Sequence, residues 1–173
     1  MNLVTCTFEQ HSSVILEIFN DAIANSTALY EYKPRTMETM KTWFTTKEVN
    51  RFPVVAALDD SGEFLGFASY GSFRAFPANK YSVEHSVYVH KNHRGQGVGK
   101  FLMHEIIVRA RAAHLHTLIG GIDAANTVSI SLHEKLGFTH AGTIRHAAFK
   151  FGRWLDLAFY QLILDTPNDP VDG

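Results

Sequence analysis

The chain has 173 residues, enough for one domain with a substantial hydrophobic core, and 46% of them are apolar. Sixteen basic and seventeen acidic side chains nearly cancel, so the overall charge gives no electrostatic reason to expect a nucleic acid or an anionic membrane as a partner. No run approaches 18 consecutive apolar residues, which argues against a membrane-spanning helix. The ten histidines are scattered and predict no metal site.

The pattern of apolar residues predicts the order of helices and strands. Apolar side chains three to four residues apart indicate helices, and short apolar runs between turn residues indicate strands. In chain order we expect a strand at 3–8, a helix from Ser12 or Ser13 to about Asn25, a loop to Arg35, a helix capped by Thr36, a hairpin of strands at 53–58 and 63–71, a strand at 82–90, a helix at 98–113, a strand at 116–122, a helix at 126–136 that ends at Gly137, and strands at 138–144 and 154–164.

This order predicts an α+β fold. The central strand–helix–strand–helix–strand pattern, flanked by hairpins, is typical of a mixed β-sheet with helices on both faces. We expect a single domain over residues 1–164 and a flexible tail, rich in Asp and Pro, over 165–173.

The cysteine content and the N-terminus bear on the compartment. Cys6 is the only cysteine, so no internal disulfide can form, which is typical of a reducing compartment. The segment MNLVTCTFEQ lacks a basic stretch followed by an apolar run, so no signal peptide is expected. We therefore predict a cytoplasmic protein in which Cys6 is a buried apolar residue of the first strand.

The clearest functional signal is the segment Arg94-Gly95-Gln96-Gly97-Val98-Gly99, between a predicted strand and a predicted helix. Its glycines let the backbone approach a ligand, and N–H groups at a helix N-terminus favour an anion. Arg94 and Lys100 add positive charge, so the predicted ligand is a phosphate or pyrophosphate. A flexible connection alone explains neither the glycine alternation nor the basic flanks.

Two common phosphate-binding motifs do not fit this segment. A Walker loop would close with Gly-Lys-Ser/Thr, which is missing here. A dinucleotide fingerprint would have the spacing G-x-G-x-x-G with an acidic residue about 20 positions later, whereas this loop is G-x-G-x-G and Asp123 lies further on.

The R-x-x-G-x-G pattern of Arg94, Gly97 and Gly99 follows the strand sequence HSVYV and resembles the acetyl-CoA pyrophosphate loop of the GNAT acetyltransferase superfamily. A second segment, from Asn126 through LHEKLGF (132–138), resembles that superfamily too. Within it, the phosphinothricin and methionine sulfone/sulfoximine N-acetyltransferases are similar in four segments, namely FRAF (73–76), EHSVYVHKNHRGQGVG (84–99), LHEKLGF and KFGRWLDLAFYQL (150–162).

The resemblance covers nearly the whole chain and implies both a fold and an activity. The implied fold is the GNAT acyltransferase fold, and the implied co-substrate is acetyl-CoA, with no metal. The acetyl group would pass directly, in a ternary complex, to the amine of a small amino-acid-like acceptor that carries a carboxylate. Related enzymes pair near 150–162, so the chain would be a homodimer, although the apolar residues there could equally belong to a core.

The resemblance also implies how acetyl-CoA would be bound. The backbone of Val87, Tyr88 and Val89 would hydrogen-bond the pantetheine arm, and Asn126 would contact the arm from the other side. The pyrophosphate would be held by the residues of the glycine-rich loop, which are Arg94, Gly95, Gln96, Gly97, Val98, Gly99 and Lys100.

Acetyl transfer requires an unprotonated amine, so a base must take a proton from the substrate ammonium. Glu84 is the candidate base, because burial in its apolar strand would raise its pKa towards the useful range. A solvated glutamate at a strand end is the alternative. His133 stands where many superfamily members carry a tyrosine that protonates the leaving thiolate. A general acid and a structural histidine both remain open for it.

The acceptor site is the least determined part. Arg74 could pair with a substrate carboxylate and Phe76 could line the pocket, although a solvated surface arginine is the alternative. His85 and Ser86, beside Glu84, complete the predicted site. The same fold would also allow a protein N-acetyltransferase or a non-catalytic acyl-CoA-binding module. The sequence leaves the physiological acceptor open.

Overall fold

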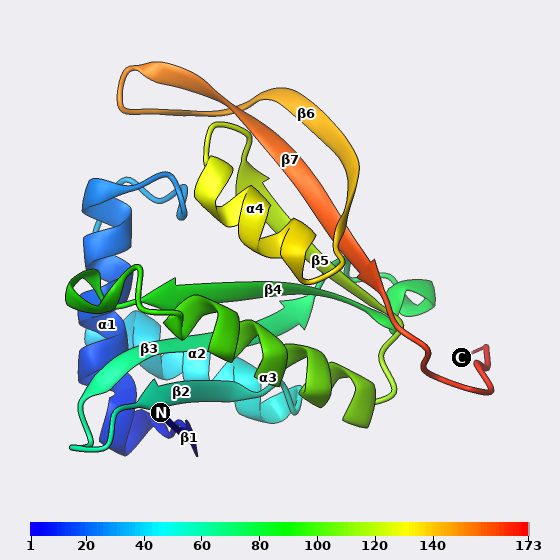
Figure 1. Ribbon diagram of the computed structural model, residues 1–173, viewed down its shortest axis with the longest axis horizontal. Coiled ribbons are helices and arrows are strands. Elements are labelled where there is room, and N and C mark those ends of the chain that lie inside the picture. Colours follow the sequence, from blue (N-terminus) through cyan, green and yellow to red (C-terminus); the bar gives the residue numbers. More distant parts are fainter. Residues whose placement is uncertain (173) are drawn as a thin grey trace. The chain divides into compact units, whose positions relative to one another are not determined.

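The computed structural model describes residues 1–172 (Figure 1). In chain order its elements are β1 (Asn2–Thr5), α1 (Phe8–Asn25), α2 (Met37–Val49), β2 (Val54–Leu58), β3 (Phe64–Ser72), the 3₁₀ turn η1 (Pro77–Asn79), β4 (Ser82–Val89), the 3₁₀ turn η2 (Lys91–His93), α3 (Val98–Ala112), β5 (Thr117–Asp123), α4 (Thr127–Lys135), β6 (Thr139–Lys150) and β7 (Arg153–Ile163).

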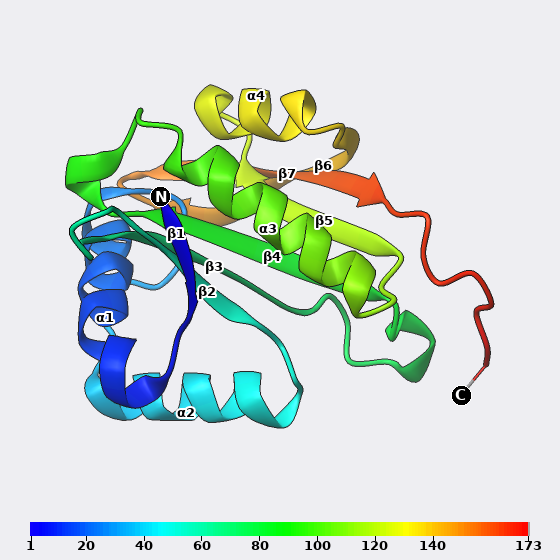
Figure 2. The same ribbon diagram turned by 60° about the horizontal axis from the view of Figure 1, so that its bottom comes forward.

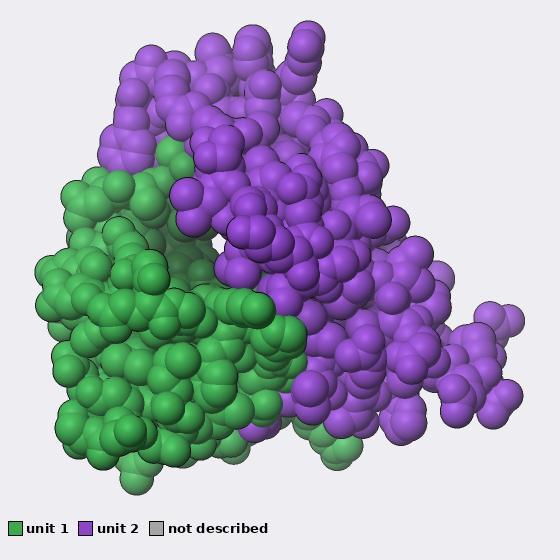
Figure 3. Space-filling model, in the orientation of Figure 1, with its two compact units in different colours: residues 1–70, 86–106 green, residues 71–85, 107–173 purple. Residues whose placement is uncertain are grey.

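The strands form one sheet in the order β1-β2-β3-β4-β5-β7-β6. β4 and β5 pair in parallel, whereas β1 with β2, β2 with β3, β5 with β7, and β6 with β7 pair antiparallel. The prediction of a mixed sheet is therefore confirmed. The chain divides into two compact units, coloured separately in Figure 3, and β3, β4 and α3 each pass from one unit to the other.

The first unit comprises Met1–Tyr70 and Ser86–Ile106. Figure 2 shows α1 and α2 on one face of β2 and β3, with the first half of α3 on the opposite face. The helices carry their apolar side chains inward because these recur at helical spacing. The resulting core joins α1, α2, β2 and β3 through Cys6, Ile15, Ile18, Phe19, Met40, Phe44, Val54, Ala56 and Phe67.

The start of α1 differs from the prediction. The helix begins at Phe8, not at Ser12 or Ser13, and Thr7 is its N-cap, whose side chain accepts a hydrogen bond from the Gln10 N–H at 3.3 Å. The predicted cap of α2 is confirmed. Thr36 caps this helix through a reciprocal capping box with Thr39.

The second unit comprises Gly71–His85 and Ile107–Gly173 as far as the structure describes it. β5 lies beside β7 over seven residue pairs, from Thr117↔Ile163 to Asp123↔Leu157 (Figure 1). β6 and β7 form a hairpin that turns through Phe151 and Gly152, and both turn residues have positive φ, as a type I′ turn requires. This hairpin makes β6 six residues longer at its end than the predicted strand.

None of the helices in the described residues is long and apolar enough to cross a membrane. The segment after β7 has neither helix nor strand up to residue 172, but it is bound to the second unit: Asp165 pairs with Arg111 at 3.0 Å, and the Thr166 carbonyl lies 2.7 Å from Nδ1 of His116.

Candidate active site

The glycine-rich loop lies in the first unit and leads directly into α3. Gly95 has φ +77° and Gly97 has φ +83°, conformations that residues with a Cβ rarely adopt. A Cβ added at either glycine would meet no protein atom within 4 Å, so the space above the loop is open. Val98 begins α3 and is buried, which anchors the loop. The loop therefore presents the N-terminus of a 15-residue helix to an anion.

Arg94 already has a protein partner. Its guanidinium donates to Oδ2 of Asp21 at 2.9 Å, and the second oxygen of Asp21 accepts from the Asn25 side chain at 2.9 Å. The Arg94 side chain is still about half exposed, whereas Asp21 is mostly buried. The contact holds the loop against α1. It also partly neutralises the Arg94 charge, which was predicted to bind the phosphate. Lys100, by contrast, is exposed.

The second half of β4 also belongs to the first unit, and here the backbone rather than the side chains is distinctive. A Cβ at Gly66 of β3 would lie 2.5 Å from the Tyr88 carbonyl oxygen and 3.0 Å from the Val89 Cα. Gly66 thus allows β4 to approach β3 closely. The Tyr88 ring stacks on Phe67 at 5.3 Å. Tyr88 is therefore held by its ring and its carbonyl oxygen lies against β3.

Glu84 lies in the second unit, where the parallel register of β4 and β5 ends at Glu84↔Ile119. Its carboxylate lies over β5, because a Cβ on Gly121 would be 2.9 Å from Oε1 of Glu84. The side chain keeps contact with solvent, but surrounding protein atoms partly desolvate it and raise its pKa above 4.5. The positive charge of Arg74 acts in the opposite direction. Glu84 is thus a carboxylate with a raised pKa that solvent can reach.

His85 and His133 form a buried pair in the same unit. Their Nε2 atoms are 2.9 Å apart and the rings stack with centroids separated by 5.1 Å. Nδ1 of His133 lies 2.7 Å from the Ser129 carbonyl, which can only accept, so Nδ1 carries the proton. Nε2 of neutral His133 is then the acceptor, and His85 donates to it.

The protonation of this pair bears on the predicted general acid. Burial lowers the pKa of His133, and burial together with the His133 charge lowers the pKa of His85 to about 3. Both rings are therefore neutral near pH 7. Neutral His133 has its single proton on Nδ1, bound to Ser129, and has none on Nε2 to give away. The geometry favours a structural role for His133, while its catalytic role stays a prediction.

Arg74 and Phe76 occupy the connection between β3 and β4. Both side chains are exposed, Phe76 to 71%. The Arg74 guanidinium lies over the Phe73 ring, 5.3 Å from its centroid. The electrostatic effect of Arg74 on Glu84 shows that the two charges are close enough to interact. An anionic group bound at Arg74 would therefore lie near the candidate base.

Asn126 is the N-cap of α4. Its Oδ1 accepts from the Ser129 N–H at 3.1 Å, which orients the amide so that Nδ2 points away from the helix. The preceding Asp123 is buried, and its Oδ2 accepts from Arg153 at 2.8 Å. The pairing of Asp123 with Arg153 was not predicted, since Asp123 was considered only as a residue of a dinucleotide site. The signal available was an acidic residue at a strand end, just before a predicted helix cap.

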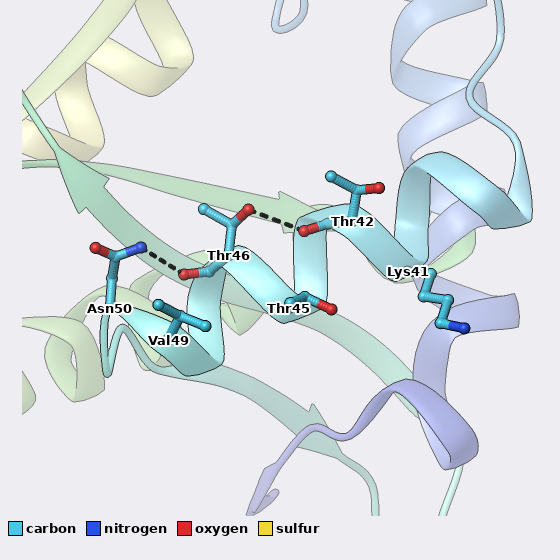
Figure 4. A pocket seen from close by; sticks show the side chains of 6 residues that line it. All are labelled: Lys41, Thr42, Thr45, Thr46, Val49 and Asn50. Carbon is cyan, nitrogen blue, oxygen red and sulfur yellow. Dashed lines mark hydrogen bonds between the residues drawn. The ribbon is translucent and has the colours of Figure 1, made fainter.

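A shallow hollow on α2 lies apart from these residues in the sequence. Figure 4 shows its lining, which consists of Lys41, Thr42, Thr45, Thr46, Val49 and Asn50. The Thr46 hydroxyl donates to the Thr42 carbonyl, and the Asn50 amide donates to the Thr46 carbonyl. Helix carbonyls thus occupy these donors, and the lining offers no pair of groups for acid–base chemistry. The described residues also contain no group of three or more His, Cys, Asp or Glu side chains suited to a metal ion.

Comparisons with known proteins give a consistent result. The model of the acetyltransferase (GNAT) family matches residues 15–138. The L-methionine sulfoximine/L-methionine sulfone acetyltransferase of Pseudomonas aeruginosa is 45% identical over 151 residues, which are 87% of this chain and 88% of the relative. The structure of a phosphinothricin acetyltransferase from Sinorhizobium meliloti, in complex with acetyl-CoA, has a TM-score of 0.90 at 37% identity and covers 94% of this chain and 88% of that one.

A third protein matches the chain with a comparable sequence identity and TM-score. The structure of a ribosomal-protein-alanine N-acetyltransferase from Brucella melitensis has a TM-score of 0.91 at 40% identity, and the alignment covers 95% of this chain and all of the other.

Proposed function

The chain belongs to the acetyltransferase (GNAT) family, and from this premise we propose that it transfers acetyl from acetyl-CoA to the amine of a small amino-acid-like acceptor. The relatives named for methionine sulfoximine, methionine sulfone and phosphinothricin support this class of acceptor. The observation that carries the proposal is Glu84, a solvent-accessible carboxylate whose pKa is raised, placed three residues before Val87 on β4.

The co-substrate supplies an activated acetyl group as a thioester, and the protein has to bind it and deprotonate the acceptor. Gly95 and Gly97, with positive φ, fit a backbone cradle for the pyrophosphate, and Val98, Gly99 and Lys100 complete the loop at the start of α3. Val87 and Val89 supply backbone groups for the pantetheine arm, and Asn126 donates from its amide. Tyr88 anchors this part of the strand through its ring.

Glu84 accepts the proton of the acceptor ammonium, directly or through one water. A carboxylate whose pKa is raised is a stronger base than an ordinary glutamate. Arg74 binds the acceptor carboxylate, which places the amine near the base, while Phe76, His85 and Ser86 complete this part of the site.

The experiment is a thiol-release assay with acetyl-CoA and a panel of acceptors. The panel holds methionine sulfone, methionine sulfoximine, phosphinothricin, the common amino acids and the decarboxylated amine of one good substrate. We expect release with the amino-acid-like acceptors and much less with the decarboxylated amine. If no acceptor on the panel releases thiol while the protein binds acetyl-CoA in calorimetry, the proposed acceptor class is wrong.

A second candidate acceptor is a peptide N-terminus, and the similarity to the ribosomal-protein-alanine N-acetyltransferase favours it. The two candidates share the base and the cofactor loop but differ in the acceptor side. Adding a short peptide with an N-terminal alanine to the panel separates them. A kcat/KM for the peptide above that of every free amino acid would favour the peptide enzyme.

The protein is also proposed to be a homodimer formed through the β6–β7 hairpin. Large apolar side chains are exposed there, namely Ile144, Phe149, Phe151 and Trp154, each at least 46% exposed. Exposed apolar patches of this kind mark interaction surfaces. Light scattering at micromolar concentration should give twice the chain mass. Trp154→Asp should reduce the measured mass to that of a single chain. Val108→Asp, at an exposed apolar position on α3, should leave the mass unchanged.

The cytoplasm is the proposed compartment, because the single cysteine, Cys6, is buried and unpaired, as is usual in a reducing environment. Fractionation of cells that produce the chain tests this.

A further inference from the structure

The turn between β5 and α4 is held by a network centred on Asp123. Its Oδ1 accepts from the Ala125 N–H at 3.0 Å, and its backbone carbonyl accepts from the Asn126 N–H at 2.7 Å. Its Oδ2 accepts from Arg153, the first residue of β7, at 2.8 Å. One buried residue therefore fixes the backbone on which Asn126 is mounted.

The same turn is fastened to β7 a second time. The Ala124 N–H donates to the Asp156 carbonyl at 2.9 Å, although the register of β5 with β7 ends at Asp123↔Leu157. Arg153 lies four residues before Leu157, in the part of β7 beyond the end of β5, so its side chain reaches back to Asp123. The Asp123 side chain is 4% exposed and that of Arg153 is 49% exposed. Loss of the cationic partner would leave this buried carboxylate without a compensating charge.

We propose that Asp123, held by Arg153, is a positioning residue that sets the orientation of the Asn126 amide and thereby the affinity for acetyl-CoA. This inference rests on the proposed contact of Asn126 with the cofactor. The Asn126 side chain is exposed, and its Oδ1 is already used to cap α4. Its direction depends on the two residues before it, and the Asp123 network fixes both of them. Misplacement of a contact group by about 1 Å is enough to weaken binding substantially.

If Asp123 affects the affinity for acetyl-CoA through Asn126, its effect must depend on the presence of Asn126. A double-mutant cycle measures this dependence. Asn126→Ser keeps a good N-cap but removes the amide, so it should weaken CoA binding about tenfold in calorimetry. Asp123→Asn keeps an oxygen acceptor and removes the charge that holds Arg153. It should also weaken CoA binding by about fivefold to tenfold in the wild-type background. In the Asn126→Ser background the same substitution should have an effect below about twofold.

Variants at Arg153 keep the test valid if Asp123→Asn folds poorly. Arg153 is half exposed, so Arg153→Met changes a surface side chain and should give the same non-additive loss of CoA affinity with Asn126→Ser. Arg153→Lys retains a cation and should restore part of that affinity. Thermal unfolding of every variant shows that the binding measurements refer to folded protein.

The outcomes separate the inference from its premise. If Asn126→Ser binds CoA as the wild type does, Asn126 is not a cofactor contact, and the premise fails together with the inference. If Asn126→Ser weakens binding but Asp123→Asn and Arg153→Met do not, the premise stands and the inference is wrong. Equal effects of Asp123→Asn in both backgrounds would also overturn it, because Asp123 would then act independently of Asn126.

Discussion

The two halves of β4 contribute to function in different ways. The first half, in the second unit, presents titratable side chains, with Glu84 over Gly121 and His85 paired to His133. The second half, in the first unit, offers backbone and continues into a loop in which Gly95 and Gly97 have positive φ. The proposed proton chemistry thus depends on functional groups, whereas the proposed cofactor binding depends on the absence of side chains.

This difference predicts distinct responses to substitution. A change of functional group that preserves shape should affect the first half and leave the second intact. A change that adds a Cβ should affect the glycine loop, and the chemistry of the added side chain should matter little. Substitutions at Glu84, Gly97, Arg74 and His133 should distinguish these two kinds of response.

Glu84→Gln should lower kcat by roughly 10²–10⁴-fold near neutral pH, the range typical for loss of a general base. The affinity for acetyl-CoA should change little, because the substitution leaves the backbone of β4 unaltered. The wild-type kcat/KM should rise with pH through an ionisation above the usual glutamate range, because burial raises the pKa of Glu84. The variant should lose or shift this limb when both enzymes are compared on one acceptor.

The stability of the Glu84→Gln variant provides the control. A carboxyl whose pKa is higher in the folded than in the unfolded state stabilises the fold at low pH, and this contribution is lost as the pH rises through the folded pKa. Glu84→Gln should therefore be no less stable than the wild type at pH 7. Glu48→Gln, at an exposed position of α2, should change neither property. Wild-type kcat in Glu84→Gln across pH 6–9 would place the base elsewhere.

Gly97→Val should weaken acetyl-CoA binding by about tenfold to 100-fold in calorimetry. The valine has to adopt φ +83° and projects its methyl groups into the space left open for the ligand. Gly62→Val is a matched control, because Gly62 has φ +88° and an equally open Cβ position in the β2–β3 turn. Both variants should lose similar stability, and only Gly97→Val should lose binding. Equal affinities in the two folded variants would exclude the loop as the pyrophosphate site.

The elements that the sequence predicted well are those with local signals. Thr36 before α2 and Gly137 after α4 are capping residues, and the structure has them in these roles, with φ +88° at Gly137. The start of α1 was predicted wrongly because Thr7 is as good a cap as the serines that follow it. The length of β6 was missed because its extension depends on pairing with β7 across a turn in which Phe151 adopts positive φ.

In the candidate site, too, features with local sequence signals were predictable, whereas contacts between distant residues were not. The glycine loop and Glu84 lie in one continuous stretch, so their spacing is visible in the sequence. The His85–His133 pair spans 48 positions and the Asp123–Arg153 pair spans 30, so neither contact can be derived without the fold. The two consecutive glycines of β5 were a usable signal. A Cβ at Gly120 would lie 2.9 Å from Nε2 of His133, and one at Gly121 would lie as close to Glu84.

Arg74→Ala should raise KM for an amino-acid acceptor about tenfold, with the KM for acetyl-CoA almost unchanged, because a charged hydrogen bond to the acceptor carboxylate is lost. Loss of the positive charge should also raise the pKa of Glu84 further, since Arg74 lowers it. The acid limb of kcat/KM should therefore move to higher pH. Lys80→Ala, which removes an exposed cation from the same connection, should do neither. An unchanged acceptor KM in Arg74→Ala would show that this arginine does not bind the carboxylate.

His133→Gln should have the smallest effect on turnover, within about threefold of the wild-type kcat, if His133 is structural. Glutamine can retain an acceptor for His85 but cannot transfer a proton, so a general acid at this position would instead cost about 10²–10⁴-fold. Stability measured against pH gives an independent check. The lowered pKa of both histidines means that the unfolded chain binds more protons below about pH 6.5, so the wild type should lose stability as the pH falls through the range between the unfolded and folded values. The stability of His133→Gln should fall less steeply with decreasing pH, because one of the two histidines with a lowered pKa is removed. A steep fall in kcat with no change in this slope would assign His133 to proton transfer.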